Sequence, residues 1–239
     1  MLVHGFTQTG ESWRHVSPTL EVDHEVIVVD APGHGGSTDI AVDLTTGAGL
    51  LAEAGGRAVY VGYSMGGRLV LRLALDQPEM VAGMVLIGAT AGIDDPAGRL
   101  ERRRSDEALA QRIERVGVAA FLDGWLAQDL FAGLPDDPGD RAARLGNSPQ
   151  SLASSLRMAG TGTMDPPWWD QLARIDVPTV VVVGEHDAKF TALGRRLVES
   201  IGSNAHLSLV PGAGHAAHLH DPAAVAGVIV DMVSRAHPT

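Results

Sequence analysis

Short apolar runs rich in β-branched residues alternate along the chain with stretches whose apolar positions recur every three or four residues. The first pattern predicts strands that are covered on both faces, and the second predicts helices that pack on them. Strands are predicted at residues 26–29, 58–61, 84–87, 179–183 and 206–210. Helices are predicted at residues 65–76, 192–201 and 222–236. This alternation indicates an α/β protein with a mostly parallel sheet and helices on both faces.

The middle of the chain has a different pattern, because residues 92–170 contain no run that predicts a strand. Residues 99–115 and 148–158 have helical periodicity, whereas the Pro, Asp and Gly residues of 135–140 predict a loop. We interpret 92–170 as a helical lid over the C-terminal edge of the sheet. The core domain is then made of residues 1–91 and 171–239.

The first strand is expected to be unusually short. Only Leu2 and Val3 form an apolar run before His4 and Gly5, yet a buried strand normally has about five or six residues. The sequence is therefore expected to begin inside a core strand, with the N-terminal strands of the fold shortened or missing.

The charge and composition exclude several classes of partner. A net charge of −11 at pH 7 repels phosphate backbones, so nucleic acid is not expected. No run approaches the roughly 20 apolar residues that cross a bilayer, and no signal-peptide pattern is visible, so no membrane partner is expected. The absence of cysteine excludes disulfides and thiolate chemistry. These features favour a cytoplasmic protein.

Gly62-Tyr63-Ser64-Met65-Gly66 places a serine between a predicted strand and a predicted helix. The G-x-S-x-G pattern in this context is typical of a nucleophile elbow, which exposes the serine hydroxyl on a sharp turn. The N–H of Met65 is then free at a helix N-terminus, where it stabilises negative charge. The loop after the first strand is expected to supply a second such donor, the N–H of Phe6.

Two further side chains follow later strands and complete a candidate triad. Asp187 follows the predicted strand at 179–183 and is preferred over Glu185, because it lies a few residues beyond the strand. His215 follows a glycine-rich turn after the last strand. A triad acid would orient the imidazole, which would act as a base toward Ser64. The alternative that His215, His218 and His220 bind a metal lacks a further ligand to complete a site.

Arginines suggest that the site binds an anion. Arg68 lies one helical turn after Ser64, so it is either part of a structural ion pair or a ligand for a substrate carboxylate. The run Arg102-Arg103-Arg104 in the lid is either a solvated face or part of an anion site. Trp125 is a candidate either for the lid core or for substrate contact.

Segments spread over nearly the whole chain resemble one family. They are residues 62–68, 101–106, 121–125 with 131, 184–190, and 213–218. These segments resemble the 2-succinyl-6-hydroxy-2,4-cyclohexadiene-1-carboxylate synthases of menaquinone biosynthesis, which have the α/β-hydrolase fold. The resemblance implies a carbon–oxygen lyase that eliminates pyruvate from 2-succinyl-5-enolpyruvyl-6-hydroxy-3-cyclohexene-1-carboxylate, a small polycarboxylate, without a metal or other cofactor.

The resemblance also implies roles for individual residues. Ser64 would remove a ring proton, with help from His215 and Asp187. Substrate-binding residues would be those that match the family's charged and aromatic pocket positions: Arg68, Arg102, Arg144, Trp125 and Tyr63.

Two alternatives remain from the residues alone. The same triad would serve a serine hydrolase of carboxylic esters or C–C bonds, although a neutral ester gives Arg68 no role. A non-catalytic ligand-sensing protein of the same fold would not need a complete triad. The sequence does not indicate an oligomeric state.

Overall fold

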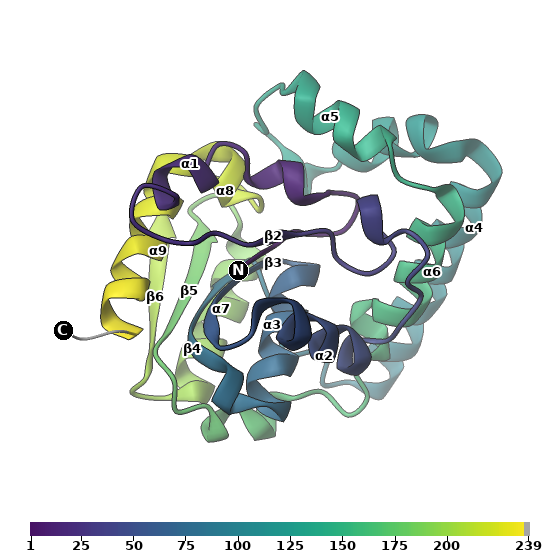
Figure 1. Cartoon of the computed structure of the whole chain (residues 1–239). Coiled ribbons are helices and arrows are strands. Elements are labelled where there is room, and N and C mark those ends of the chain that lie inside the picture. Colours follow the sequence, from purple (N-terminus) through teal and green to yellow (C-terminus); the bar gives the residue numbers. More distant parts are fainter. Residues whose placement is uncertain (237–239) are drawn as a thin grey trace.

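A computed structural model describes residues 1–236, in which all six strands run parallel in one sheet of order β2-β1-β3-β4-β5-β6 (Figure 1). The strands are β1 (Leu2–Val3), β2 (Val28–Val29), β3 (Ala58–Tyr63), β4 (Val81–Ile87), β5 (Thr179–Gly184) and β6 (Ala205–Val210). The order reverses at β1, which lies between β2 and β3. The loops after β1 and β3 therefore diverge at one point of the C-terminal edge, the usual place for a ligand site in such sheets.

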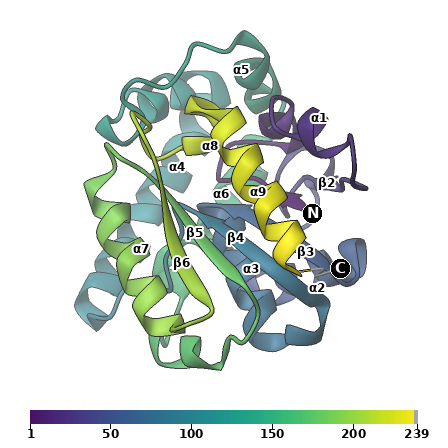
Figure 2. The ribbon, with the colours of Figure 1, turned by 90° about the vertical axis from the view of Figure 1, so that its left-hand side faces the viewer.

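Helices cover both faces of the sheet. One face packs against α2 (Leu44–Gly55), α3 (Met65–Asp76) and α7 (Ala188–Ile201), and the other packs against α1 (Ser17–Leu20) and α9 (Pro222–Ala236). Figure 2 shows α9 to the right of β5 and β6 and α7 to their left, so the two helices lie on opposite sides of these strands. Side chains alternate along β4, where Met84 faces the first core and Val85 faces the second, as the two-residue period of a strand requires.

A group of helices that we call the cap lies beside the C-terminal edge of the sheet (Figure 1). It consists of α4 (Pro96–Leu126), α5 (Pro138–Leu145) and α6 (Pro149–Ala159). Within α4 the helix is interrupted at Gly117, where φ is 76°. A third apolar cluster holds α4 against α6 and includes Ile113 and Leu152.

Shorter elements connect these helices and strands. Helix α8 covers Ala217–His220, and the 3₁₀ turns are Gly10–Trp13, Gly35–Ser37, Pro78–Met80, Asp129–Phe131, Thr161–Thr163 and Trp169–Arg174. Within residues 1–236, no helix combines the length and apolar character needed to span a bilayer.

Most of the predicted elements are confirmed, and three differences have local causes. The segment 135–140 is not all loop, because α5 begins at Pro138 once Asp137 accepts hydrogen bonds from Gly139 and Asp140. Helix α2, which Asp43 caps at its N-terminus, was not predicted. Helix α7 starts four residues before the predicted helix, since Asp187 caps it.

Candidate active site

Ser64 lies on a strained turn between β3 and α3. Its φ and ψ are 50° and −101°, a region that non-glycine residues rarely occupy and that is often found at functional sites. The Ser64 N–H donates to the carbonyl of Ile87 at 2.8 Å, which fixes the turn to β4. A Cβ at Gly66 would stand 2.3 Å from the Val3 carbonyl oxygen, so the elbow packs against β1 through a position that only glycine fits.

The three predicted triad residues meet at the C-terminal edge of the sheet. The Nε2 atom of His215 is 3.3 Å from Ser64 Oγ, and its Nδ1 is 2.7 Å from Asp187 Oδ2. Asp187 and His215 are both buried. The Asp187 Oδ1 atom also accepts the N–H of Phe190 at 3.0 Å, which holds the carboxylate in place. This geometry supports an imidazole that takes a proton from the serine hydroxyl and a carboxylate that orients the ring.

Two residues whose backbone N–H groups were predicted as oxyanion donors share a cavity with Ser64. Phe6 and Met65 both line the same cavity as Ser64. Within residues 1–236 neither N–H donates to a protein acceptor. They are therefore available to a negatively charged oxygen, as predicted oxyanion donors should be.

The cavity above Ser64 holds about 290 Å³. Its walls come from the triad loops, α3 and the cap, and they include Tyr63, Arg68, Arg102, Trp125, Phe131, Lys189 and Phe190. Trp125 packs edge to face against Phe6, with ring centroids 5.4 Å apart. Its Nε1–H has no acceptor within the described part of the chain. Four of the five predicted substrate-binding residues therefore lie around the serine.

Arg68 has no acidic partner within ion-pair distance among residues 1–236. Its guanidinium donates to the carbonyl of Ala159, and burial lowers the pKa of Arg68 to about 9. Asp106 attracts this cation from beyond ion-pair distance, but a buried charge that lacks a direct ion pair remains costly. The arrangement argues against the structural ion-pair interpretation and fits a residue whose partner is an incoming anion.

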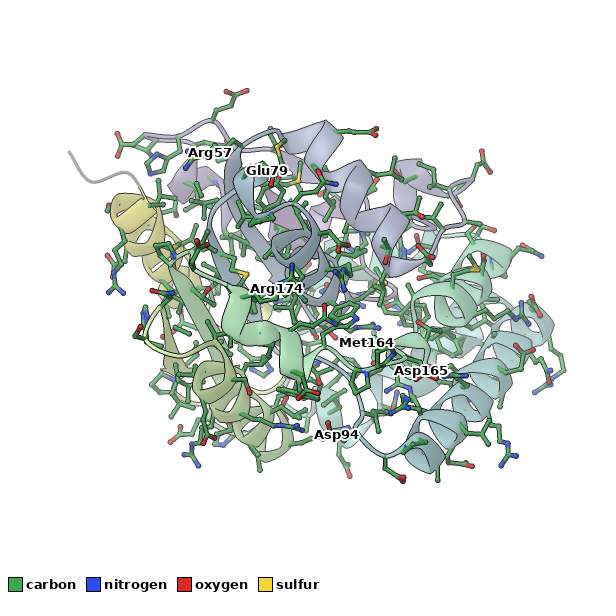
Figure 3. All side chains as sticks on the ribbon, turned by 90° about the horizontal axis from the view of Figure 1, so that it is seen from below. Arg57, Glu79, Asp94, Met164, Asp165 and Arg174 are labelled. Atoms are coloured by element: carbon green, nitrogen blue, oxygen red, sulfur yellow. The ribbon has the colours of Figure 1, made fainter. Side chains whose placement is uncertain are left out.

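Arg102 and Asp106 form an ion pair on the side of the cavity that the cap provides. Arg102 Nε lies 2.8 Å from Asp106 Oδ1, and the Arg102 side chain is 37% exposed. Burial raises the pKa of Asp106, although the neighbouring Arg102 opposes that shift. Arg103, the next residue, turns away to Asp165, which Figure 3 labels beside α4. Of the arginine run 102–104, only Arg102 faces the cavity.

Tyr63 packs against the imidazole of His215 in the wall of the cavity. Its ring centroid lies 5.3 Å from that of His215 and 4.4 Å from that of His218. Burial raises the pKa of Tyr63, so the phenol stays neutral. His218 is also packed against Trp13, and residues 1–236 contain no group of three His, Asp or Glu side chains arranged to hold a metal ion.

Arg144 lies outside the wall of the cavity, in contrast to the other predicted binding residues. It is buried on α5, where its Nε is 2.5 Å from Asp140 Oδ2 and its Nη1 donates to Thr7 Oγ1. Its cation is thus already paired within the protein.

Lys189 lines the cavity, although no role was predicted for it. It is the single lysine of the chain, it is exposed, and it lines the cavity beside Phe190 and His215. Within the described residues it has no ion-pair partner. Two signals were available in the sequence: its position two residues after the triad acid, and its membership in the Asp187-Ala188-Lys189-Phe190 segment.

Comparisons with known proteins give the fold family and the most similar relatives. Residues 1–228 match the model of the alpha/beta hydrolase family. The 2-succinyl-6-hydroxy-2,4-cyclohexadiene-1-carboxylate synthase of Escherichia coli O1:K1 / APEC is 32% identical over 98% of this chain and 92% of that protein.

Two solved structures extend the comparison. MenH from S. aureus superposes with a TM-score of 0.90 at 29% identity, covering 98% of this chain and 92% of that one. A thermophilic esterase from Thermogutta terrifontis, solved with malate bound, gives a TM-score of 0.83 at 26% identity, covering 99% and 89%. Both share the fold with this chain over nearly its whole length.

Proposed function

Because the chain belongs to the 2-succinyl-6-hydroxy-2,4-cyclohexadiene-1-carboxylate synthase family of α/β hydrolases, we propose that it is the lyase that eliminates pyruvate from 2-succinyl-5-enolpyruvyl-6-hydroxy-3-cyclohexene-1-carboxylate. The reaction is a step of menaquinone biosynthesis. It needs a base for a carbon-bound proton, donors for a developing oxyanion and cations for the substrate carboxylates.

Proton removal is the task of Ser64. His215 accepts the hydroxyl proton of Ser64, and the alkoxide then takes the proton from C2 of the ring. Because C2 is adjacent to the succinyl ketone, the charge it leaves spreads onto the ketone oxygen. The N–H groups of Phe6 and Met65 stabilise that oxygen.

Expulsion of the leaving group completes the 1,4-elimination. The electron pair from C2–H forms the C2=C3 double bond, the C3=C4 pair moves to C4=C5, and the C5–O bond breaks. The imidazolium of His215 returns its proton to the departing enolpyruvate, which becomes pyruvate. Ser64 ends the cycle with its hydroxyl restored.

One observation carries the proposal: the triad shares its cavity with three cations and a single carboxylate. Arg68, Arg102 and Lys189 line the cavity, and Asp106 is the one acid among the lining residues. The substrate has three carboxylates, so it suits this excess of positive charge on a chain whose net charge is −11. We propose that residues 92–170 act as the lid that brings Arg102 and Trp125 to the substrate.

Pyruvate release tests the proposal directly. Purified protein incubated with the enolpyruvyl cyclohexene should release pyruvate in a coupled lactate dehydrogenase assay, and Ser64→Ala should reduce kcat at least about 1000-fold. Rapid turnover of p-nitrophenyl butyrate without any pyruvate release would contradict the lyase assignment.

A second candidate is a hydrolase of esters that carry carboxylates. The same triad and donors would stabilise a tetrahedral intermediate, and the esterase neighbour was solved with malate, a dicarboxylate. The two reactions differ in their covalent chemistry. A hydrolase accumulates an acyl-enzyme on Ser64 that intact-mass spectrometry detects, whereas the elimination forms no such adduct.

A further inference from the structure

Thr7 adopts a backbone conformation that its side chain disfavours. It follows Phe6, it is completely buried, and its φ is 69°. The Gln8 N–H donates to the Gly5 carbonyl at 3.2 Å, so Phe6 and Thr7 are the central residues of a tight turn. At the second central position a positive φ is normally given to glycine or asparagine, and a β-branched residue there needs outside support.

That support reaches every polar group of Thr7. Its N–H donates to His34 Nε2 at 3.3 Å. Its carbonyl accepts Asn147 Nδ2 at 2.9 Å, and its hydroxyl accepts Arg144 Nη1. Two of the three partners thus come from the cap, at the end of α5 and just after it.

Arg144 is itself held by an ion pair one helical turn away. Its Nε lies 2.5 Å from Asp140 Oδ2, and both side chains are buried. Residues four apart on a helix meet in this way, and the pair neutralises a charge that would otherwise be costly at this depth. Neither residue lines the cavity.

We propose that the Asp140–Arg144 pair is a positioning device that clamps Thr7, and through the turn holds the Phe6 N–H where negative charge develops. The inference rests on the oxyanion role given to Phe6 in the proposed function. It assigns Arg144 to the turn and leaves carboxylate binding to the cations of the cavity. It also means that the cap contributes to catalysis through the backbone of the core.

A neutral boronic acid separates the two roles for Arg144. Butylboronic acid has no carboxylate, and its adduct with Ser64 places an anionic oxygen between the backbone donors. We expect Arg144→Met to weaken butylboronate binding about 10-fold or more and to lower kcat about 10- to 100-fold, the scale for one misplaced oxyanion donor. KM for the polycarboxylate should change less than about threefold.

Matched variants complete the design. Arg141 lies on the same helix but pairs at the surface with Asp123, so Arg141→Met should leave boronate affinity and kcat unchanged. If Arg144→Met folds poorly because Asp140 is left unpaired, Arg144→Met/Asp140→Leu replaces it. Thr7→Gly in either background should restore much of the boronate affinity, because glycine takes a positive φ without support.

The contrary outcomes are specific. A large rise in KM with unchanged boronate affinity would show that Arg144 binds a carboxylate and would overturn the clamp. A lower Tm with unchanged kcat and boronate affinity would reduce the pair to a structural role and also overturn it. Failure of the wild-type protein to bind boronate would remove the Phe6 premise and the inference with it. If Arg144→Met weakens boronate binding but the wild-type protein releases no pyruvate, the lyase assignment is refuted and the clamp is supported.

Discussion

Gly88 faces the imidazole of His215 so closely that a Cβ on it would stand 2.8 Å from the Cε1 atom of that ring. Gly88 follows β4, and its φ of 56° also favours glycine. His215 can therefore occupy its position beside Ser64 and Asp187 only because residue 88, at the end of β4, has no side chain.

Gly88→Ala should therefore displace His215 and lower kcat about 100-fold, because small misplacements of a catalytic base are costly. Gly56→Ala is the matched control. Its φ is 57°, and a Cβ there would meet no atom within 4 Å, so it places alanine at a similar positive φ without the clash. Steady-state kinetics and thermal melts of both variants check this. Equal kcat losses in the two variants would show that strain, and not displacement of the ring, is responsible.

Arg68→Met should raise KM for the polycarboxylate about 10- to 100-fold, the value of a hydrogen-bonded charge contact. Its Tm should stay the same or rise, because the substitution removes a buried cation that has no acidic partner within ion-pair distance. Kinetics and calorimetry on the same preparation provide the measurement. A sharp fall in Tm with little change in KM would instead indicate a structural role for the guanidinium.

Acetylation of Lys189 should raise KM, because the modification removes one of the three cavity cations. Reductive methylation retains the positive charge and should leave KM nearly unchanged. Lys189→Arg provides the control, since it keeps the charge and limits amine modification to the N-terminus. Substrate should also protect Lys189 from acetylation, and peptide mass spectrometry follows that protection. Equal labelling with and without substrate would exclude contact between the lysine and the substrate.

Acid should destabilise the fold below about pH 6.5. Burial lowers the pKa of His34 to about 3 and that of His4 to about 4. Below pH 6.5 these two histidines are therefore protonated in the unfolded chain but remain neutral in the folded chain. The free energy of unfolding is highest above that pH and falls toward pH 4 by about 1.4 kcal/mol per pH unit for each such histidine.

Urea unfolding at pH 7.5, 6.0 and 5.0 measures this loss. His34→Gln retains an acceptor for the Thr7 N–H. In this variant the pH dependence of the free energy of unfolding should correspond to about one proton fewer. A free energy of unfolding that stays constant between pH 7.5 and 5.0 would contradict the prediction.

Sequence patterns were sufficient for the sheet and for the meeting of Ser64, Asp187 and His215, because each of the three follows a strand whose apolar run is easy to identify. The charged residues were harder to place. Asp140 and Arg144 are four residues apart, a spacing that indicates an ion pair only on a helix, and the Pro, Asp and Gly residues of 135–140 concealed the start of α5. Arg68 donates to the carbonyl of Ala159 on α6 and has no acid within ion-pair distance among residues 1–236. That arrangement depends on where the cap lies, which local spacing does not encode.

The interruption of α4 at Gly117 separates two contributions to the cavity. The half before Gly117 carries Arg102 and Asp106, and the half after it carries Trp125. A substitution at Gly117 can change the position of Trp125 while Arg102, Asp106 and Ser64 keep their positions. Contacts with the apolar part of a bound molecule could therefore be altered separately from contacts with its charged groups.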